Sequence, residues 1–340
     1  MSDATLPPYV NFLMDPASHS GSVDEVQLIQ THISFVHVAG DFVYKWKKEV
    51  DFGFLDFSTL QKRKLCCEQE LVLNRRLCPE IYLEVVTINL DGDRFSLGGP
   101  GEVVEYGVKM ARMPEEKMMG RVVKAGGLNE SELDRIIDVL VPFYSEATGG
   151  EALAVFGKAD SVGVNVLENF DQTESFIGSP GLDRERFEKI KAYAADFLTL
   201  EDRFQQRIDE GRIRDCHGDL YSANICLADK VYIFDCIEFN ERFRYSDVAA
   251  DVAFLAMDLD FHELDELSDY FIRRFIAQSG DATLAGMLNF YKCYRAYVRG
   301  KIGLFTAADP GVDKAVADSC REQAARYFEL AERYAADETA

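Results

Sequence analysis

The amino-terminal part of the chain alternates apolar and polar positions in short runs, a pattern typical of β-strands. Residues 33–48 predict a hairpin whose turn is Ala39-Gly40-Asp41, because β-branched and aromatic residues flank that turn. Residues 81–99 predict a second hairpin around Asp91-Gly92-Asp93. Residues 103–113 predict one more strand, which ends before a proline. Together these segments predict a small antiparallel sheet.

One helix is expected between the two hairpins. Ser58 or Thr59 can cap its start, and Pro79 follows its end. Its apolar positions fall loosely at helical spacing: Leu60, Leu65, Leu71, Leu73 and Leu77.

The pattern changes after Pro114, where apolar residues recur at helical spacing over longer segments. Helices are predicted over 131–147, over 183–211 and from 264 almost to the end of the chain. The fold class is therefore α+β with two lobes. We expect a first domain at 1–112, made of the sheet with its helix, and a larger, mainly helical second domain at 113–340.

Composition restricts the partners of the chain more than its chemistry. Hydrophobic residues make up 47% of the 340 residues, which is enough for a sizeable core. The formal net charge of −22 argues against nucleic acid as a partner and is compatible with a cationic or neutral ligand. The start of the chain lacks a basic, then apolar, leader, and no stretch is apolar enough to span a bilayer, so we expect a cytoplasmic protein without a membrane partner. The eight cysteines form no C-x-x-C pair, which indicates neither a zinc site nor a disulfide framework.

The residues with the strongest chemical signal lie in the segment DCHGDLYSANICL. His217, Asp219 and Asn224 match the pattern H-x-D-L-x-x-x-N, the catalytic-loop signature of kinases, with Gly218 in the place of arginine. In that pattern the aspartate orients a hydroxyl for attack and the asparagine ligates magnesium. The alternative is that His217 is a core histidine and Asp219 a turn carboxylate.

A second candidate follows at hairpin distance, where Asp235 ends the apolar strand of VYIFDCIEF. A carboxylate there can hold the metal ion that neutralises nucleotide phosphates. An aspartate at a strand end carries little information by itself, and its place after the first motif makes it a candidate.

The third candidate is a lysine and glutamate pair. Lys45 lies on the second strand of the first hairpin, and Glu70 lies on the helix that follows. In kinases a strand lysine binds the α- and β-phosphates and is held by a helix glutamate. Lys47 shares a strand face with Lys45, and Glu68 is a rival of Glu70, so both choices stay open.

On these residues the chain resembles the aminoglycoside phosphotransferase family, in the group that also contains choline and methylthioribose kinases. The segments CHGDLYSANICL, IFDCIEF and YSDVAADVAFLAMDL carry the resemblance. The segments QTHISFVHVAGDFVYKWKK and YKCYRAYVRGK are similar to a bacterial branch that is often fused to a P-loop ATPase domain. No G-x-x-x-x-G-K-[ST] motif is present, so we expect this chain to lack that domain.

The resemblance implies a protein-kinase-like fold and magnesium-dependent transfer of the γ-phosphate of ATP or GTP to a hydroxyl of a small molecule. It implies that Asp219 is the catalytic aspartate, beside His217, and that Asn224 and Asp235 ligate magnesium. Lys45 and Glu70 would clamp the phosphates, and a hinge over 108–114 that includes Met110 would bind the nucleotide base. Asp251 would brace the catalytic loop.

The sequence departs from the kinase pattern at several positions. No glycine-rich G-x-G-x-x-G loop is present, and the corresponding turn at 31–34 contains no glycine, which leaves the choice between ATP and GTP open. Cys236-Ile237 follows Asp235 in the place of Phe-Gly, and no A-P-E follows, which argues against activation-loop control. A nucleotide-binding pseudokinase and a kinase of a protein substrate are the alternative functions. The sequence identifies neither the acceptor nor the oligomeric state.

Overall fold

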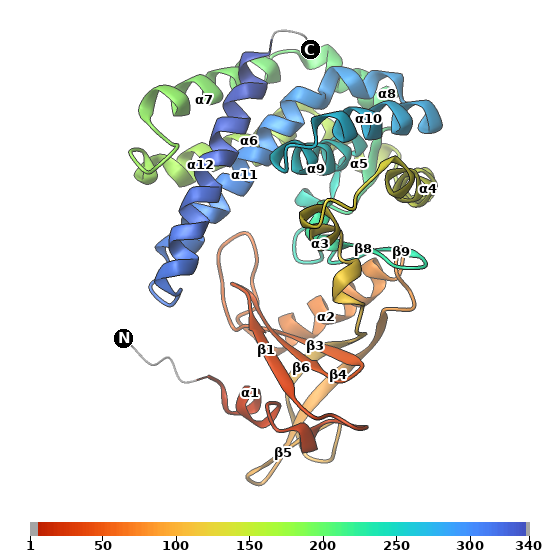
Figure 1. Cartoon of the computed structure of the whole chain (residues 1–340), viewed down its shortest axis with the longest axis vertical. Coiled ribbons are helices and arrows are strands. Elements are labelled where there is room, and N and C mark those ends of the chain that lie inside the picture. Colours follow the sequence, from red (N-terminus) through yellow and green to blue (C-terminus); the bar gives the residue numbers. More distant parts are fainter. Residues whose placement is uncertain (1–5, 338–340) are drawn as a thin grey trace. The chain divides into compact units, whose positions relative to one another are not determined.

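The structure is a computed structural model described over residues 6–337, and it divides into two compact units (Figure 1). The first unit contains the chain up to Lys117 together with Tyr232–Asn240. The second contains Met118–Val231 and the chain from Glu241 onward. The division differs from the predicted boundary after residue 112, because the segment that contains Asp235 belongs to the first unit.

The first unit is built on a six-stranded sheet in which every pair of neighbours is antiparallel. Its strands, in spatial order, are β1 (Val26–Gln30), β2 (Ser34–Ala39), β3 (Phe42–Lys47), β6 (Glu102–Ala111), β4 (Tyr82–Asp91) and β5 (Arg94–Leu97). Both predicted hairpins and the later strand are confirmed. The edge strand β1 was not expected, because its polar sequence VQLIQ has only a short apolar alternation.

The alternation of side chains along β3 gives the two faces of this sheet different characters. Tyr44 and Trp46 lie in an apolar cluster with Val10, close to the short helix α1 (Pro8–Phe12). A Cβ at Gly107, which pairs with Trp46 across the ladder, would lie 2.5 Å from the indole ring, so only glycine fits there. Lys45 and Lys47 point to the other face.

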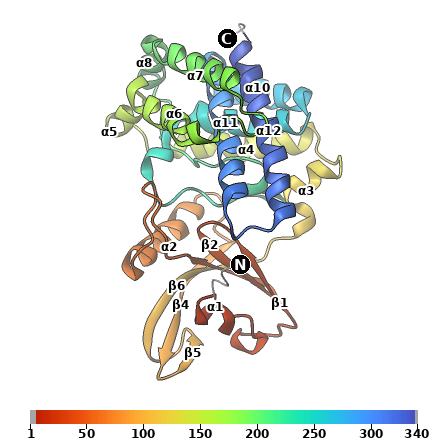
Figure 2. The same cartoon turned by 90° about the vertical axis from the view of Figure 1, so that its left-hand side faces the viewer.

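The second face of the sheet is covered by α2 (Leu60–Asn74), the predicted helix (Figure 2). Thr59 caps it, since its hydroxyl accepts the Lys62 amide at 3.3 Å. Buried Cys67 of this helix packs with Tyr82 and Val108 of the sheet. The helix is therefore fixed over β6 and β4, and its Glu70 reaches both lysines of β3.

The second unit is mainly helical. Its longer helices are α4 (Glu130–Glu146), α6 (Ala159–Thr173), α7 (Arg184–Leu198), α8 (Glu201–Asp209), α9 (Val248–Phe261), α10 (Asp265–Ser279), α11 (Leu288–Ala308) and α12 (Lys314–Ala336). Shorter elements are α3 (Met119–Lys124), α5 (Glu151–Ala154), and the strands β7 (Ile213–Asp215), β8 (Ile225–Leu227) and β10 (Tyr245–Asp247). Strand β9 (Val231–Ile233) leads the chain from this unit into the first.

The centre of the second unit is α9, which packs against α11, while α11 and α12 lie side by side (Figure 1). All 14 residues of α9 are buried. Its pattern lacks a polar face, which is why sequence periodicity did not reveal it. The predicted run over 183–211 is interrupted at Thr199 and Leu200 and forms α7 and α8.

The predicted α+β class, with a small antiparallel sheet that carries one long helix and a larger helical part, is confirmed. Within residues 6–337, no helix is both long enough and apolar enough to cross a bilayer.

Candidate active site

The predicted lysine and glutamate pair is present in the first unit. Lys45 Nζ lies 2.9 Å from Glu70 Oε1, and it also donates a hydrogen bond to Asp235 Oδ1. The Glu70 side chain is fully buried, whereas 42% of the Asp235 side chain is exposed. The lysine therefore connects a buried helix carboxylate to a carboxylate that solvent can reach.

The backbone at Asp235 is held in an unusual conformation. Its φ of 63° lies in the left-handed region, which non-glycine residues rarely adopt. The Asp235 amide donates to the Tyr82 hydroxyl at 3.2 Å, and the Cys236 amide donates to Asn74 Oδ1 at 2.9 Å. Asn74 in turn donates to the Glu70 carbonyl at 2.8 Å. These bonds fix the aspartate to α2 and to the sheet, and such strain is common at functional sites.

Glu68 and Lys47, the rivals of Glu70 and Lys45 in the sequence, differ in their contacts. Glu68 is exposed, and its carboxylate lies 3.8 Å from Lys64 Nζ, one helical turn away on the same helix. Lys47 does reach Glu70, at 2.7 Å from Oε2, and it also donates to Glu238. Glu70 therefore accepts one ammonium group on each oxygen. Burial alone would raise the pKa of Glu70, but Lys45 and Lys47 lower it to about 2.

Met110 lies within β6 and not in a free hinge. It pairs with Val43 on one side and with Tyr82 on the other. The strand ends at Ala111, whose amide donates to the Ile81 carbonyl at 2.8 Å. The Met110 side chain is partly buried and packs against the apolar cluster that contains Cys67 and Val108.

The catalytic-loop motif lies in the second unit, and Asp251 of α9 braces it. Asp251 Oδ2 accepts the His217 amide at 2.7 Å, and Oδ1 accepts the Gly218 amide at 2.9 Å. Tyr144 donates its hydroxyl to the same carboxylate at 3.1 Å. Gly218 has a φ of 88°, a conformation that favours glycine in the place of the usual arginine.

His217 and Asn224 hold Asp219 from two sides. The Asp219 amide donates to His217 Nδ1 at 3.2 Å, and the histidine itself is buried. Asn224 Nδ2 donates to the Asp219 carbonyl at 3.0 Å and to its Oδ2 at 2.9 Å. The three motif residues thus form one hydrogen-bonded group. Asp219 is partly exposed, as a carboxylate must be if a hydroxyl group is to contact it.

One neighbour of this loop, Asp258, was missed in the sequence. Asp258 Oδ2 accepts the Ser222 amide at 3.0 Å, so α9 holds the loop at two points. Its spacing of seven residues from Asp251, two helical turns, was the available signal. Arg299 of α11 lies over the Tyr221 ring at 4.7 Å, and Tyr221 stacks on Phe254.

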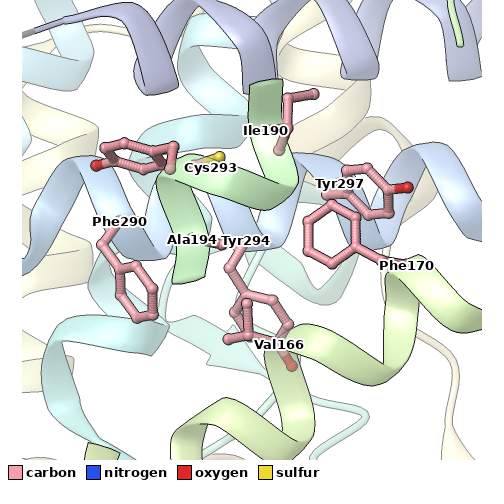
Figure 3. Close-up of a pocket in the computed structure, with 9 residues that line it drawn as sticks. Val166, Phe170, Ile190, Ala194, Phe290, Cys293, Tyr294 and Tyr297 are labelled. Atoms are coloured by element: carbon pink, nitrogen blue, oxygen red, sulfur yellow. The ribbon is translucent and has the colours of Figure 1, made fainter. Parts of the chain in front are cut away.

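Two tyrosines of α11 line a small cavity in the second unit. Tyr294 and Tyr297 line a cavity of about 10 Å³ with Phe170 and Ile190 (Figure 3). This volume is at the lower limit for one water molecule, and the lining is aromatic and aliphatic. The cavity is therefore a packing defect between α6, α7 and α11.

The donor groups fit magnesium. In the second unit Asn224 directs its amide nitrogen to Asp219, which leaves its carbonyl oxygen as a donor, and in the first unit Asp235 carries carboxylate oxygens. Magnesium prefers oxygen ligands and commonly takes few from protein when phosphates supply others. No cluster of three metal-binding side chains occurs among residues 6–337.

The turn between β1 and β2 differs from a glycine-rich phosphate loop. The Thr31 hydroxyl accepts the Ser34 amide at 2.9 Å and the Ile33 amide at 3.3 Å. Since these amides are bonded within the turn, they are not directed at a ligand.

Comparison with known sequences finds relatives that are longer than the matched region. No family model matches the chain. An uncharacterized protein of Mycobacterium tuberculosis and another of Mycobacterium bovis are each 32% identical over 318 residues. The match covers 91% of this chain and 62% of each relative, so the chain spans about three fifths of their length.

Comparison with solved structures finds small-molecule kinases. A choline/ethanolamine kinase family protein from Mesorhizobium loti is 13% identical, with 92% of this chain and 94% of that chain covered and a TM-score of 0.48. The aminoglycoside phosphotransferase APH(3'')-Id from Streptomyces rimosus is 16% identical, with 84% and 97% covered and a TM-score of 0.48. A glucosamine kinase in complex with glucosamine, ADP and inorganic phosphate is 14% identical, with 95% and 80% covered and a TM-score of 0.48. Because all three TM-scores lie below 0.5, the functional proposal rests on the residues of the chain itself.

Proposed function

We propose that this chain transfers the γ-phosphoryl group of ATP or GTP, as a magnesium complex, to a hydroxyl group of a small molecule. The observation that carries the proposal is the buried Lys45 and Glu70 ion pair, with Asp235 on the same lysine. A lysine held in this way is suited to bind nucleotide phosphates, because the helix carboxylate keeps it charged and oriented. Burial alone would lower the pKa of Lys45, but Asp235, Glu70 and Glu238 raise it well above its ordinary value.

The second unit supports the same reaction with a different group. Asp219 would accept the hydrogen bond of the acceptor hydroxyl and orient it for in-line attack. Asn224 fixes one oxygen of that carboxylate, and Asp251 fixes the backbone on which it stands. Because phosphoryl transfer depends mostly on positioning and charge neutralisation, this bracing is where the protein contributes to the rate.

Magnesium would be held by Asn224 and Asp235. When bound, the ion would neutralise the charge of the phosphate oxygens. The acceptor remains to be identified by screening hydroxylated amines, sugars and aminoglycosides; the net charge of −22 is compatible with a cationic acceptor.

The first test is the thermal unfolding midpoint with ATP, GTP or neither, each with and without magnesium. A ligand that binds the folded state raises the midpoint by mass action, so we expect a magnesium-dependent rise for the wild type. Asp235→Ala should lose the magnesium-dependent part. Asp219→Ala should keep the rise but lose transfer by about 100-fold or more, since its carboxylate contacts the acceptor.

Asp171→Ala, a change of the same type at an exposed position of α6, is the control and should behave as the wild type. Full turnover by Asp219→Ala, or no rise with either nucleotide at millimolar concentration, would contradict the proposal. A magnesium-dependent rise without transfer to any acceptor would instead favour a nucleotide-binding regulator.

A further inference from the structure

The first unit contains a second lysine and glutamate pair beside the predicted one. Lys47 Nζ lies 2.7 Å from Glu70 Oε2 and donates to Glu238, while Lys45 contacts the other oxygen of Glu70. The side chain of Lys47 is 1% exposed and that of Glu238 is 4% exposed. Four charged groups therefore form one buried chain, in the order Lys45, Glu70, Lys47, Glu238.

The surroundings of the second pair exclude solvent. Lys47 Nζ lies 5.0 Å from the centroid of the Phe57 ring, and Phe239 packs edge-on against Phe57. Burial alone would lower the pKa of Lys47, but Glu238 and Glu70 raise it well above its ordinary value. In such a low-dielectric environment each ion pair is strong, and a charge left without its partner is costly.

The pair is too buried to contact a ligand, yet it is coupled to the residues that would. If the proposed function holds, nucleotide binding gives Lys45 phosphate oxygens and gives Asp235 a metal ion. The bond between Lys45 and Asp235 seen here must then break, and Glu70 becomes the remaining protein anchor of Lys45. Glu70 can stay in place because Lys47 holds its second oxygen.

We propose that Lys47 and Glu238 are positioning residues for nucleotide binding: they hold Glu70 so that Lys45 stays oriented when it exchanges Asp235 for phosphate. This inference rests on the proposed function. It deepens that function by assigning a role to Lys47, the rival of Lys45 in the sequence, and to Glu238. Glu238 lies three positions after Asp235, so the segment that carries the metal aspartate also fixes the lysine anchor.

The test compares nucleotide affinity in three variants. Lys47→Met/Glu238→Gln removes both charges of the pair together, which a buried site tolerates better than the loss of one. We expect this double variant to fold, and its Kd for magnesium ATP to rise about tenfold or more, as for other residues that orient a ligand-binding group. The single variants Lys47→Met and Glu238→Gln, if they fold, give the effect of each charge on the Kd separately.

A matched control is available in the second unit. Lys292 Nζ lies 2.9 Å from Asp260 Oδ2, and both side chains are buried. This pair is therefore similar in chemistry to the Lys47 and Glu238 pair. Lys292→Met/Asp260→Asn should lower the thermal midpoint without ligand but leave the Kd for magnesium ATP unchanged. If both double variants lose a comparable amount of thermal midpoint but only Lys47→Met/Glu238→Gln changes the Kd, the change of Kd comes from positioning and not from a loss of stability.

A further comparison asks whether the pair acts through Lys45. Lys45→Met should weaken nucleotide binding strongly in the wild type and much less in the Lys47→Met/Glu238→Gln background, because coupled residues are not additive. Additive effects, or an unchanged Kd in the double variant, would overturn the inference while the wild type still binds nucleotide. Absence of nucleotide binding by the wild type would instead refute the proposed function.

Discussion

At the scale of single residues, the buried carboxylates of the candidate site lie against charged or hydrogen-bonding partners. Glu70 has an ammonium group on each oxygen, and Asp251 accepts two backbone amides and a tyrosine hydroxyl. Buried groups of this kind cost free energy unless they are satisfied, so their presence near the motif residues indicates a requirement of the site. His37 is the contrasting case, because few interactions offset the cost of burying its charged form.

His37 should make the first unit sensitive to acid. Its side chain is buried in β2, and burial lowers its pKa from 6.5 to about 4, with His19 adding to the shift. The unfolded chain therefore takes up a proton at a higher pH than the folded one, so stability is complete above pH 6.5 and declines as the pH falls toward 4. At about 1.4 kcal/mol per pKa unit, the loss is about 3 kcal/mol.

The measurement is urea unfolding of the wild type and His37→Gln at several pH values. The variant should lose less stability than the wild type between pH 6.5 and 4. His32→Gln, at an exposed position of the same unit, is the control and should follow the wild type. Identical pH profiles for all three proteins would show that His37 titrates normally.

At the scale of elements, two helices organise the candidate site. In the second unit α9 holds the catalytic loop through Asp251 and Asp258, and Asp247, which caps its start, is paired with Arg207 at 2.7 Å. In the first unit α2 supplies Glu70 and fixes Asp235 through Asn74. The position of each helix therefore decides whether the motif residues meet their partners.

The Thr59 cap at the start of α2 should contribute measurably to the stability of the protein. The Thr59 hydroxyl accepts the Lys62 amide, so Thr59→Ala leaves that amide without its cap and should cost about 1 kcal/mol. Thr59→Ser keeps the hydroxyl and should recover most of the loss. Urea unfolding of the three proteins measures the difference, and an equal loss for both variants would mean that the threonine methyl group matters more than the cap.

At the scale of the whole molecule, the net charge of −22 is the dominant property. Many like charges on one folded chain repel one another and destabilise the compact state, although they favour solubility. Charged side chains are paired in part, for example Arg186 with Glu332 at 2.7 Å, but the excess is large. The chain should therefore respond to ionic strength more than a neutral protein of its size.

Raising sodium chloride from about 20 mM to about 300 mM shortens the Debye length from roughly 20 Å to roughly 6 Å, and the thermal midpoint should rise by a few degrees. Potassium chloride should act equally, because the effect is screening. The comparison is made without nucleotide or magnesium. A midpoint that is flat or that falls with salt would show that attractive ion pairs outweigh the repulsion.

The sequence by itself determined the local structure and the chemical candidates. Turn residues and alternation located both hairpins, capping located α2, and fixed spacing identified His217, Asp219 and Asn224. These features depend on residues close together in the chain, so they can be read from it. The edge strand β1 and the fully buried α9 were not predicted because neither shows a clear period.

Only the tertiary structure decided which distant residues act together. Lys45 and Lys47 are equivalent on their strand, but Lys45 contacts the partly exposed Asp235 whereas Lys47 contacts the buried Glu238. Asp235 is assigned to the first unit by packing on α2, although it follows the catalytic loop closely in sequence. The physical reason is that such pairings depend on packing between segments far apart in the chain, which local periodicity does not encode.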